Sequence, residues 1–91
     1  MKKLAILQDN NALNEQMKTL FENTGKFEVV CIATDGAKGL EAIQTAKPDI
    51  LITELVLAGI DGLFVIENVK QTCPETKIIN AIIATINLSD I

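Results

Sequence analysis

The chain has no histidine, no tryptophan and no tyrosine, and its only aromatic side chains are three phenylalanines among 91 residues. Without histidine it lacks the commonest general base and a frequent metal ligand. No serine or cysteine stands beside a base, and no glycine-rich phosphate loop is present. We therefore expect no enzymatic activity, and the scarcity of aromatic residues predicts a core of aliphatic side chains.

Cysteine is nearly absent as well. Cys31 lies in an apolar, strand-like segment and Cys73 directly precedes Pro74, without CxxC spacing. No histidine could complete a zinc or redox site around them. Because buried thiols commonly act as small hydrophobic side chains, we assign both to packing.

Long basic runs and long apolar runs are also missing. The formal net charge is −4 and no run of lysine or arginine exceeds Lys2-Lys3, so direct nucleic-acid binding by this segment is not expected. The apolar run that follows stops at Gln8-Asp9, which is too short for a signal-peptide core or a membrane span. These features predict a cytoplasmic location.

The length of 91 residues allows one small domain, and its apolar segments alternate with segments of helical periodicity. We predict strands over 3–7, 27–33, 50–53 and within 77–85, with helices after the first three. This order predicts an α/β fold with a doubly wound parallel sheet and right-handed crossovers. The leucine and isoleucine positions of the helices, Leu20 and Leu63 among them, are assigned to the core.

The most informative segment is KPDILITELVLAGIDG, residues 47–62. Its apolar run between Pro48 and Gly59 does not alternate with polar residues, which favours a parallel strand buried on both faces. Open parallel sheets bind ligands beyond the carboxyl ends of their strands. Glu54, at the end of this strand, therefore stands at a ligand-binding position.

This segment resembles the third strand and following loop of response-regulator receiver domains, where K-P-D and a hydrophobic run precede an aspartate, an M-P pair and D-G. The acceptor aspartate of that family is Glu54 here, and the M-P pair is Leu57-Ala58. The resemblance implies a flavodoxin-like sheet of order 2-1-3-4-5 and a role in two-component or phosphorelay signalling. It also implies a histidine kinase or phosphotransferase and an output domain as partners.

Receiver domains continue with a helix, a strand that carries a phosphoryl-contacting lysine, and a last helix. No residue of this sequence matches that lysine, so the resemblance implies a partial receiver domain over residues 1–91.

A metal site is predicted where the first and third strands end. Gln8-Asp9 follows the first strand and Glu54 the third, and neighbouring parallel strands share one crevice at their carboxyl ends. Two carboxylates with a backbone carbonyl form the partial shell of oxygen ligands that Mg²⁺ accepts. By resemblance, Asp9 binds the metal directly and the backbone carbonyl of Val56 completes the protein ligands. Gln8 replaces the first of the two adjacent aspartates that the family usually has here, and it would lie behind the direct ligands. Glu54 stands for the phospho-acceptor.

Departures from the family pattern predict impaired phosphoryl acceptance. In-line transfer depends on positioning, so a nucleophile moved by one methylene, about 1.5 Å, should lose orders of magnitude in rate. Gln8 removes a charge from the metal shell, so Mg²⁺ should bind weakly. In the family a serine or threonine near the end of the fourth strand contacts the phosphoryl group. The corresponding residue here is Ile82 or Ala84, depending on the register, and neither has a hydroxyl. Thr85 could take this position only if the strand shifted by one residue, which would turn its side chain to the opposite face.

Simpler interpretations of the same residues stay open. Asp9 and Asp61 could each be a helix N-cap, because a short acceptor side chain satisfies amides of the first turn. Glu54 could be a solvated loop residue, and Asp35-Gly36 is typical of a turn. A generic α/β domain without phosphotransfer would show all of these signals.

The uncharged run over residues 78–86 predicts self-association. It is longer than a typical strand and carries no charge, as in segments that pair with another chain. We expect a homodimer, formed by strand pairing or by exchange of this C-terminal segment, in which Ile79, Ile82 and Ile83 lie at the interface. The alternative function is therefore a dimerisation or scaffold module of the same fold without phosphotransfer.

Overall fold

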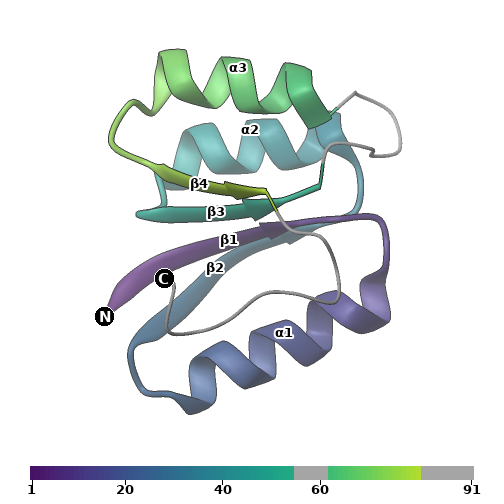
Figure 1. Cartoon of the computed structure of the whole chain (residues 1–91), viewed down its shortest axis with the longest axis vertical. Coiled ribbons are helices and arrows are strands. Elements are labelled where there is room, and N and C mark those ends of the chain that lie inside the picture. The colour runs from purple at the N-terminus through teal and green to yellow at the C-terminus, as the bar shows by residue number, and fades with distance from the viewer. Residues whose placement is uncertain (55–61, 81–91) are drawn as a thin grey trace.

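The computed structural model describes residues 1–54 and 62–80, which form a parallel sheet covered by helices on both faces (Figure 1). The strands are β1 (Lys2–Leu7), β2 (Phe27–Ala33), β3 (Ile50–Thr53) and β4 (Lys77–Asn80). The helices are α1 (Asn11–Asn23), α2 (Gly36–Ala46) and α3 (Gly62–Thr72). The strand order is β2-β1-β3-β4 and every pairing is parallel. The predicted α/β fold and flavodoxin-like order are thus confirmed through the fourth strand.

The core consists of two hydrophobic clusters, one on each face of the sheet, because successive residues of β1 point to opposite faces. Leu4 and Ile6 pack with Phe21 of α1 in the first cluster. Ala5 and Leu7 pack with buried side chains of α2 and α3 in the second cluster. Figure 1 shows the same division, with α1 on one side of the sheet and the other two helices on the opposite side.

Helix α1 is capped by Asn10 and not by Asp9, so the interpretation of Asp9 as an N-cap is wrong. Asn10 has an extended backbone, with φ of −113° and ψ of 103°. Its Oδ1 accepts a hydrogen bond of 3.0 Å from the amide of Leu13, one of the first-turn donors that lack a helical partner. The side chain of Asp9 therefore plays no part in the cap.

Helix α2 has defined ends. The Oδ1 of Asp35 accepts hydrogen bonds from the amides of Ala37 and Lys38 at 2.8 and 3.1 Å, so the predicted turn is an N-cap. The helix stops at Lys47, whose φ of 47° places it in the left-handed region directly before Pro48.

Two leucines assigned to the core are exposed, so this part of the prediction is wrong. Leu20 is 54% exposed and Leu63 is 51% exposed. In α1 the most buried positions are Asn14 and Phe21, which lie on one face of the helix, and Leu20 lies beside that face. Leu63 precedes the buried stripe of α3, which runs through Val65, Ile66 and Val69.

Several predictions concern residues outside the described ranges. They are those on Val56, Leu57-Ala58, Asp61, Ile82, Ile83, Ala84 and Thr85. Both cysteines are free thiols, Cys31 half-buried and Cys73 buried. No helix in the described ranges has the length and apolarity that a membrane span requires.

Removal of the α2 cap should destabilise the protein measurably. Asp35→Ala deletes the acceptor of two amides and should lower the free energy of unfolding by about 1 kcal/mol. Asp35→Asn keeps a short acceptor side chain and should recover most of that loss. Urea unfolding followed by circular dichroism measures both, and an equal loss in the two variants would contradict the capping role.

Candidate acidic site at the carboxyl ends of the strands

The candidate site begins where β1 and β3 end together. Leu7 and Thr53 are the last paired residues of the two strands, and the carbonyl of Leu7 accepts a hydrogen bond of 3.1 Å from the amide of Glu54. On the other side of β1, the amide of Gln8 donates to the carbonyl of Ala33 at 3.2 Å. Backbone hydrogen bonds to both neighbouring strands therefore hold the end of β1 and position the residues that follow it.

Asp9 and Glu54 are close enough to interact electrostatically. Glu54 is half-buried and Asp9 is exposed. Partial burial raises the pKa of the Glu54 carboxyl above its ordinary value, and the nearby negative charge of Asp9 raises it further. The structure thus brings together the two carboxylates that the sequence predicts to meet where β1 and β3 end.

Thr53 supports the backbone next to Glu54. Its side chain is fully buried at 0% exposure, and its hydroxyl donates a hydrogen bond of 3.2 Å to the carbonyl of Glu54. The hydroxyl is thereby satisfied within the fold, as a buried polar group must be. Thr53 was expected only to form part of the strand, and it also orients the peptide that follows the acidic residue.

Gln8, directly before Asp9, is buried. Its side chain is 2% exposed, and its backbone carbonyl accepts a hydrogen bond of 3.1 Å from Nδ2 of Asn14, which is itself 0% exposed. Sequence analysis did not identify Asn14. The available signal was a polar residue at helical spacing from Met17 and Phe21, on the apolar face of α1.

The donor set fits a divalent cation in part. Within the described ranges, no group of three or more histidine, cysteine, aspartate or glutamate side chains could hold a metal. Asp9 and Glu54 supply two carboxylates, and a cation between them would relieve their mutual repulsion. Mg²⁺ commonly takes one or two protein carboxylates and keeps several waters, so these residues suit a weak, water-rich site.

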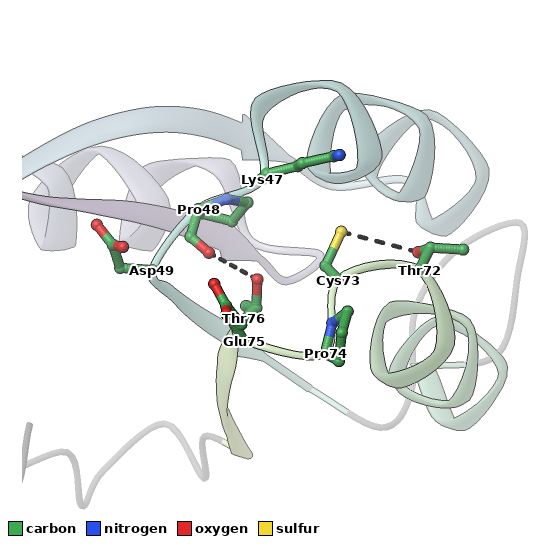
Figure 2. A pocket seen from close by; sticks show the side chains of 8 residues that line it. All are labelled: Lys47, Pro48, Asp49, Thr72, Cys73, Pro74, Glu75 and Thr76. Atoms are coloured by element: carbon green, nitrogen blue, oxygen red, sulfur yellow. Dashed lines mark hydrogen bonds between the residues drawn. The ribbon is translucent and has the colours of Figure 1, made fainter.

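A cavity of about 250 Å³ lies at the opposite, amino-terminal edge of the sheet (Figure 2). Its lining comes from residues 47–49, directly before β3, and residues 72–76, from the last residue of α3 to the start of β4. The hydroxyl of Thr76 donates a hydrogen bond of 2.6 Å to the carbonyl of Pro48, and the hydroxyl of Thr72 lies 3.7 Å from the Cys73 sulfur. The bond from Thr76 to Pro48 joins the two connections to each other, so the cavity follows from the packing of two loops at the edge opposite to the acidic residues.

Comparison with known proteins defines the family. Residues 4–88 match the response regulator receiver domain. A transcriptional regulator of Pseudomonas aeruginosa is 34% identical over 79 residues, covering 87% of this chain and 38% of the relative. The transcriptional regulatory protein YhcZ of Bacillus subtilis is 30% identical over 77 residues, covering 85% of this chain and 36% of the relative. The chain belongs to the response regulator receiver domain family, and it spans well under half the length of these two relatives.

Solved structures agree on the fold. A LuxR-family response regulator from Staphylococcus aureus superposes with a TM-score of 0.79 at 24% identity, covering 86% of this chain and 65% of that chain. The receiver domain of NarL from Mycobacterium tuberculosis superposes with a TM-score of 0.77 at 26% identity, covering 85% and 62%. The order β2-β1-β3-β4 is therefore that of a receiver sheet.

The raised pKa of Glu54 predicts how stability depends on pH when divalent cations are removed. The folded state binds a proton at Glu54 at a higher pH than the unfolded state does, so the charged form costs stability at neutral pH. Glu54→Gln should therefore be more stable than the unmodified protein at pH 7. This advantage should shrink as the pH falls through the raised pKa, because the unmodified side chain then becomes neutral as well.

Urea unfolding at a series of pH values in the presence of a chelator measures this difference. Glu67→Gln, at an exposed position of α3, is the matched control for removing one carboxylate from the protein surface. A constant difference between Glu54→Gln and the unmodified protein across the pH range would contradict the proposed interaction with Asp9.

Proposed function

We propose that this chain is the receiver domain of a two-component or phosphorelay signalling protein that is impaired in phosphoryl acceptance. Family membership supports the signalling role. The observation that carries the proposal is the meeting of Asp9 and Glu54 at the ends of β1 and β3, with a glutamate at the acceptor position. In this proposal Glu54 contributes a standing negative charge, and the domain acts through protein contacts around the strand ends.

The chemistry of phosphoryl transfer supports the impairment. Transfer requires the attacking oxygen to lie in line with the leaving group, and the glutamate side chain extends the oxygen by one methylene, about 1.5 Å. Gln8 contributes no charge to a bound cation, because its side chain is a neutral, buried carboxamide. Both features lower the expected rate, one through position and the other through weaker Mg²⁺ binding.

The partners in this proposal follow from the family. They are a histidine kinase or phosphotransferase and an output domain, because the relatives are named as transcriptional regulators and the chain covers 38% and 36% of them. We further propose a cytoplasmic location, no enzymatic activity of its own and no direct nucleic-acid binding by this segment. Residues 8–11, 32–36 and 61–63 also look like the receiver of the sporulation-initiation regulator of spore-forming bacteria, a closer assignment that the relatives reported above do not support.

Phosphoryl labelling tests the proposal directly. With radiolabelled acetyl phosphate and Mg²⁺, the unmodified chain should incorporate no acid-labile label, because Glu54 is a poor acceptor. Glu54→Asp shortens the side chain and should gain slow, Mg²⁺-dependent labelling. Adding Asp9→Asn to that variant should abolish the gain, because it removes one of the two carboxylates that bind the metal.

Rapid labelling of the unmodified chain would refute the proposed impairment. A spectral response to beryllofluoride and Mg²⁺ in Glu54→Asp, but not in the unmodified chain, would place the defect at Glu54. No response in either protein would favour the scaffold function instead.

We also propose self-association through the fourth strand. Within the described residues β4 is the last strand of the sheet and pairs only with β3. Ile78 and Ile79 remain half-buried, and the uncharged run continues to residue 86. Apart from Lys77 at its first position, this edge strand carries no charge, and such an apolar edge is a site for pairing with another chain. We therefore propose a homodimer through Ile79, Ile82 and Ile83.

Sedimentation measures the association. The unmodified chain should sediment as a dimer, and Ile82→Lys or Ile83→Lys should shift it toward monomer because a charge would enter an apolar contact. Leu20→Lys changes an exposed apolar side chain of α1 in the same way and should leave the dimer intact. A folded monomer at high concentration in the unmodified protein would refute the proposal.

A further inference from the structure

Two buried carboxamide side chains stand at the end of β1 and in α1. Gln8 is 2% exposed and Asn14 is 0% exposed, although both side chains are polar. Leu4 and Ile6 pack on the α1 face of the sheet, and β1 keeps a regular parallel register with β3 up to Leu7. Two residues beyond Ile6, Gln8 belongs to the same face. The side chain at the first acidic position of the family is thus directed toward α1.

One hydrogen bond already joins the two residues. Nδ2 of Asn14 donates to the backbone carbonyl of Gln8 at 3.1 Å. That carbonyl belongs to the peptide group that links Gln8 to Asp9. The amide on the other side of Gln8 donates to the carbonyl of Ala33 at 3.2 Å. Asn14 therefore holds the backbone at the point where the chain leaves the sheet and turns into the acidic crevice.

The same two side chains each keep one unpaired atom. Within the described ranges, Nε2 of Gln8 and Oδ1 of Asn14 are buried without a hydrogen-bond partner. The first atom is a donor and the second an acceptor, so a single bond between them would satisfy both. Buried polar groups are costly when unpaired, which favours any small side-chain rotation that closes this bond.

We propose that Gln8 and Asn14 form a closed carboxamide pair and that Asn14 is the positioning residue of the acidic site. The pair replaces the charge of the usual first acid with hydrogen bonds to α1, and it orients the peptide before Asp9. This inference rests on the proposed function only where it concerns the metal, since the pairing itself involves no ligand. It also explains why an asparagine stands on the apolar face of α1 without a solvent contact.

The pairing is tested first in the unmodified protein by NMR. The side-chain amide protons of Gln8 should exchange with solvent at least about tenfold more slowly than those of Gln16 and Gln71, since hydrogen-bonded buried groups are protected. Gln16 and Gln71 are exposed and serve as controls within the same spectrum. Equal exchange rates in the three glutamines would overturn the closed pair.

The positioning role is tested with Asn14→Leu, which keeps the size of the side chain and removes its hydrogen bonds. It should weaken Mn²⁺ binding about tenfold, since a small misplacement of a ligand is enough for such a loss. It should also raise the exchange rate of the Asp9 amide. Asn68→Leu removes a comparable bond, from Nδ2 to the carbonyl of Phe64 at 2.9 Å in α3, and should change neither quantity by more than about twofold.

The outcomes separate this inference from the proposed function. Unchanged Mn²⁺ affinity and unchanged Asp9 exchange in a folded Asn14→Leu would overturn the positioning role. If the unmodified protein binds no Mn²⁺, the metal part of the proposed function fails and the exchange rates alone decide the positioning role. If Asn14→Leu does not fold, Gln8→Met tests the pair instead, because it removes Nε2 of Gln8 and keeps the hydrogen bond from Asn14 to the backbone carbonyl. Faster exchange of the Asp9 amide in Gln8→Met would support the pair, and an unchanged exchange rate would overturn it.

Discussion

The parallel pairing of β1 with β3 is the constraint on which the site depends. Leu4 to Leu7 pair in register with Ile50 to Thr53, so both strands end at the same edge of the sheet. In an antiparallel pairing the residues after the two strands would lie at opposite edges. Because the crossover through α2 returns the chain in the same direction, Asp9 and Glu54 meet although 45 positions separate them in the sequence.

This meeting of like charges has a cost that the rest of the site moderates. Partial burial raises the pKa of Glu54 and the repulsion by Asp9 raises it further, and a third carboxylate at the position of Gln8 would add to the repulsion. A buried carboxamide at this position avoids that charge, and Asn14 holds the backbone carbonyl of the same residue. The neutral residue therefore suits a site that does not depend on tight binding of a cation, in agreement with a glutamate at the acceptor position.

Much of the fold could be predicted from sequence, because periodicity reports which residues are buried. The unbroken apolar run before Glu54 predicts a strand covered on both faces, as β3 is. Asp9 and Asn10 are equally able to cap a helix, and only the backbone conformation shows that Asn10 does so. The role of Asn14 could not be predicted, since its partner on β1 is defined by packing and not by spacing along the chain. The exposure of Leu20 depends in the same way on how α1 is rotated against the sheet.

The central claim is that Asp9 and Glu54 form one cation-accepting crevice at the ends of β1 and β3. Titration with paramagnetic Mn²⁺ in two-dimensional NMR tests it most directly, since line broadening falls steeply with distance from the ion. The account predicts selective broadening of the amides of Asp9 and Glu54 at low Mn²⁺ concentration. Broadening that appears first around Asp49 and Glu75, the carboxylates at the opposite cavity, or at no residue in particular, would contradict it.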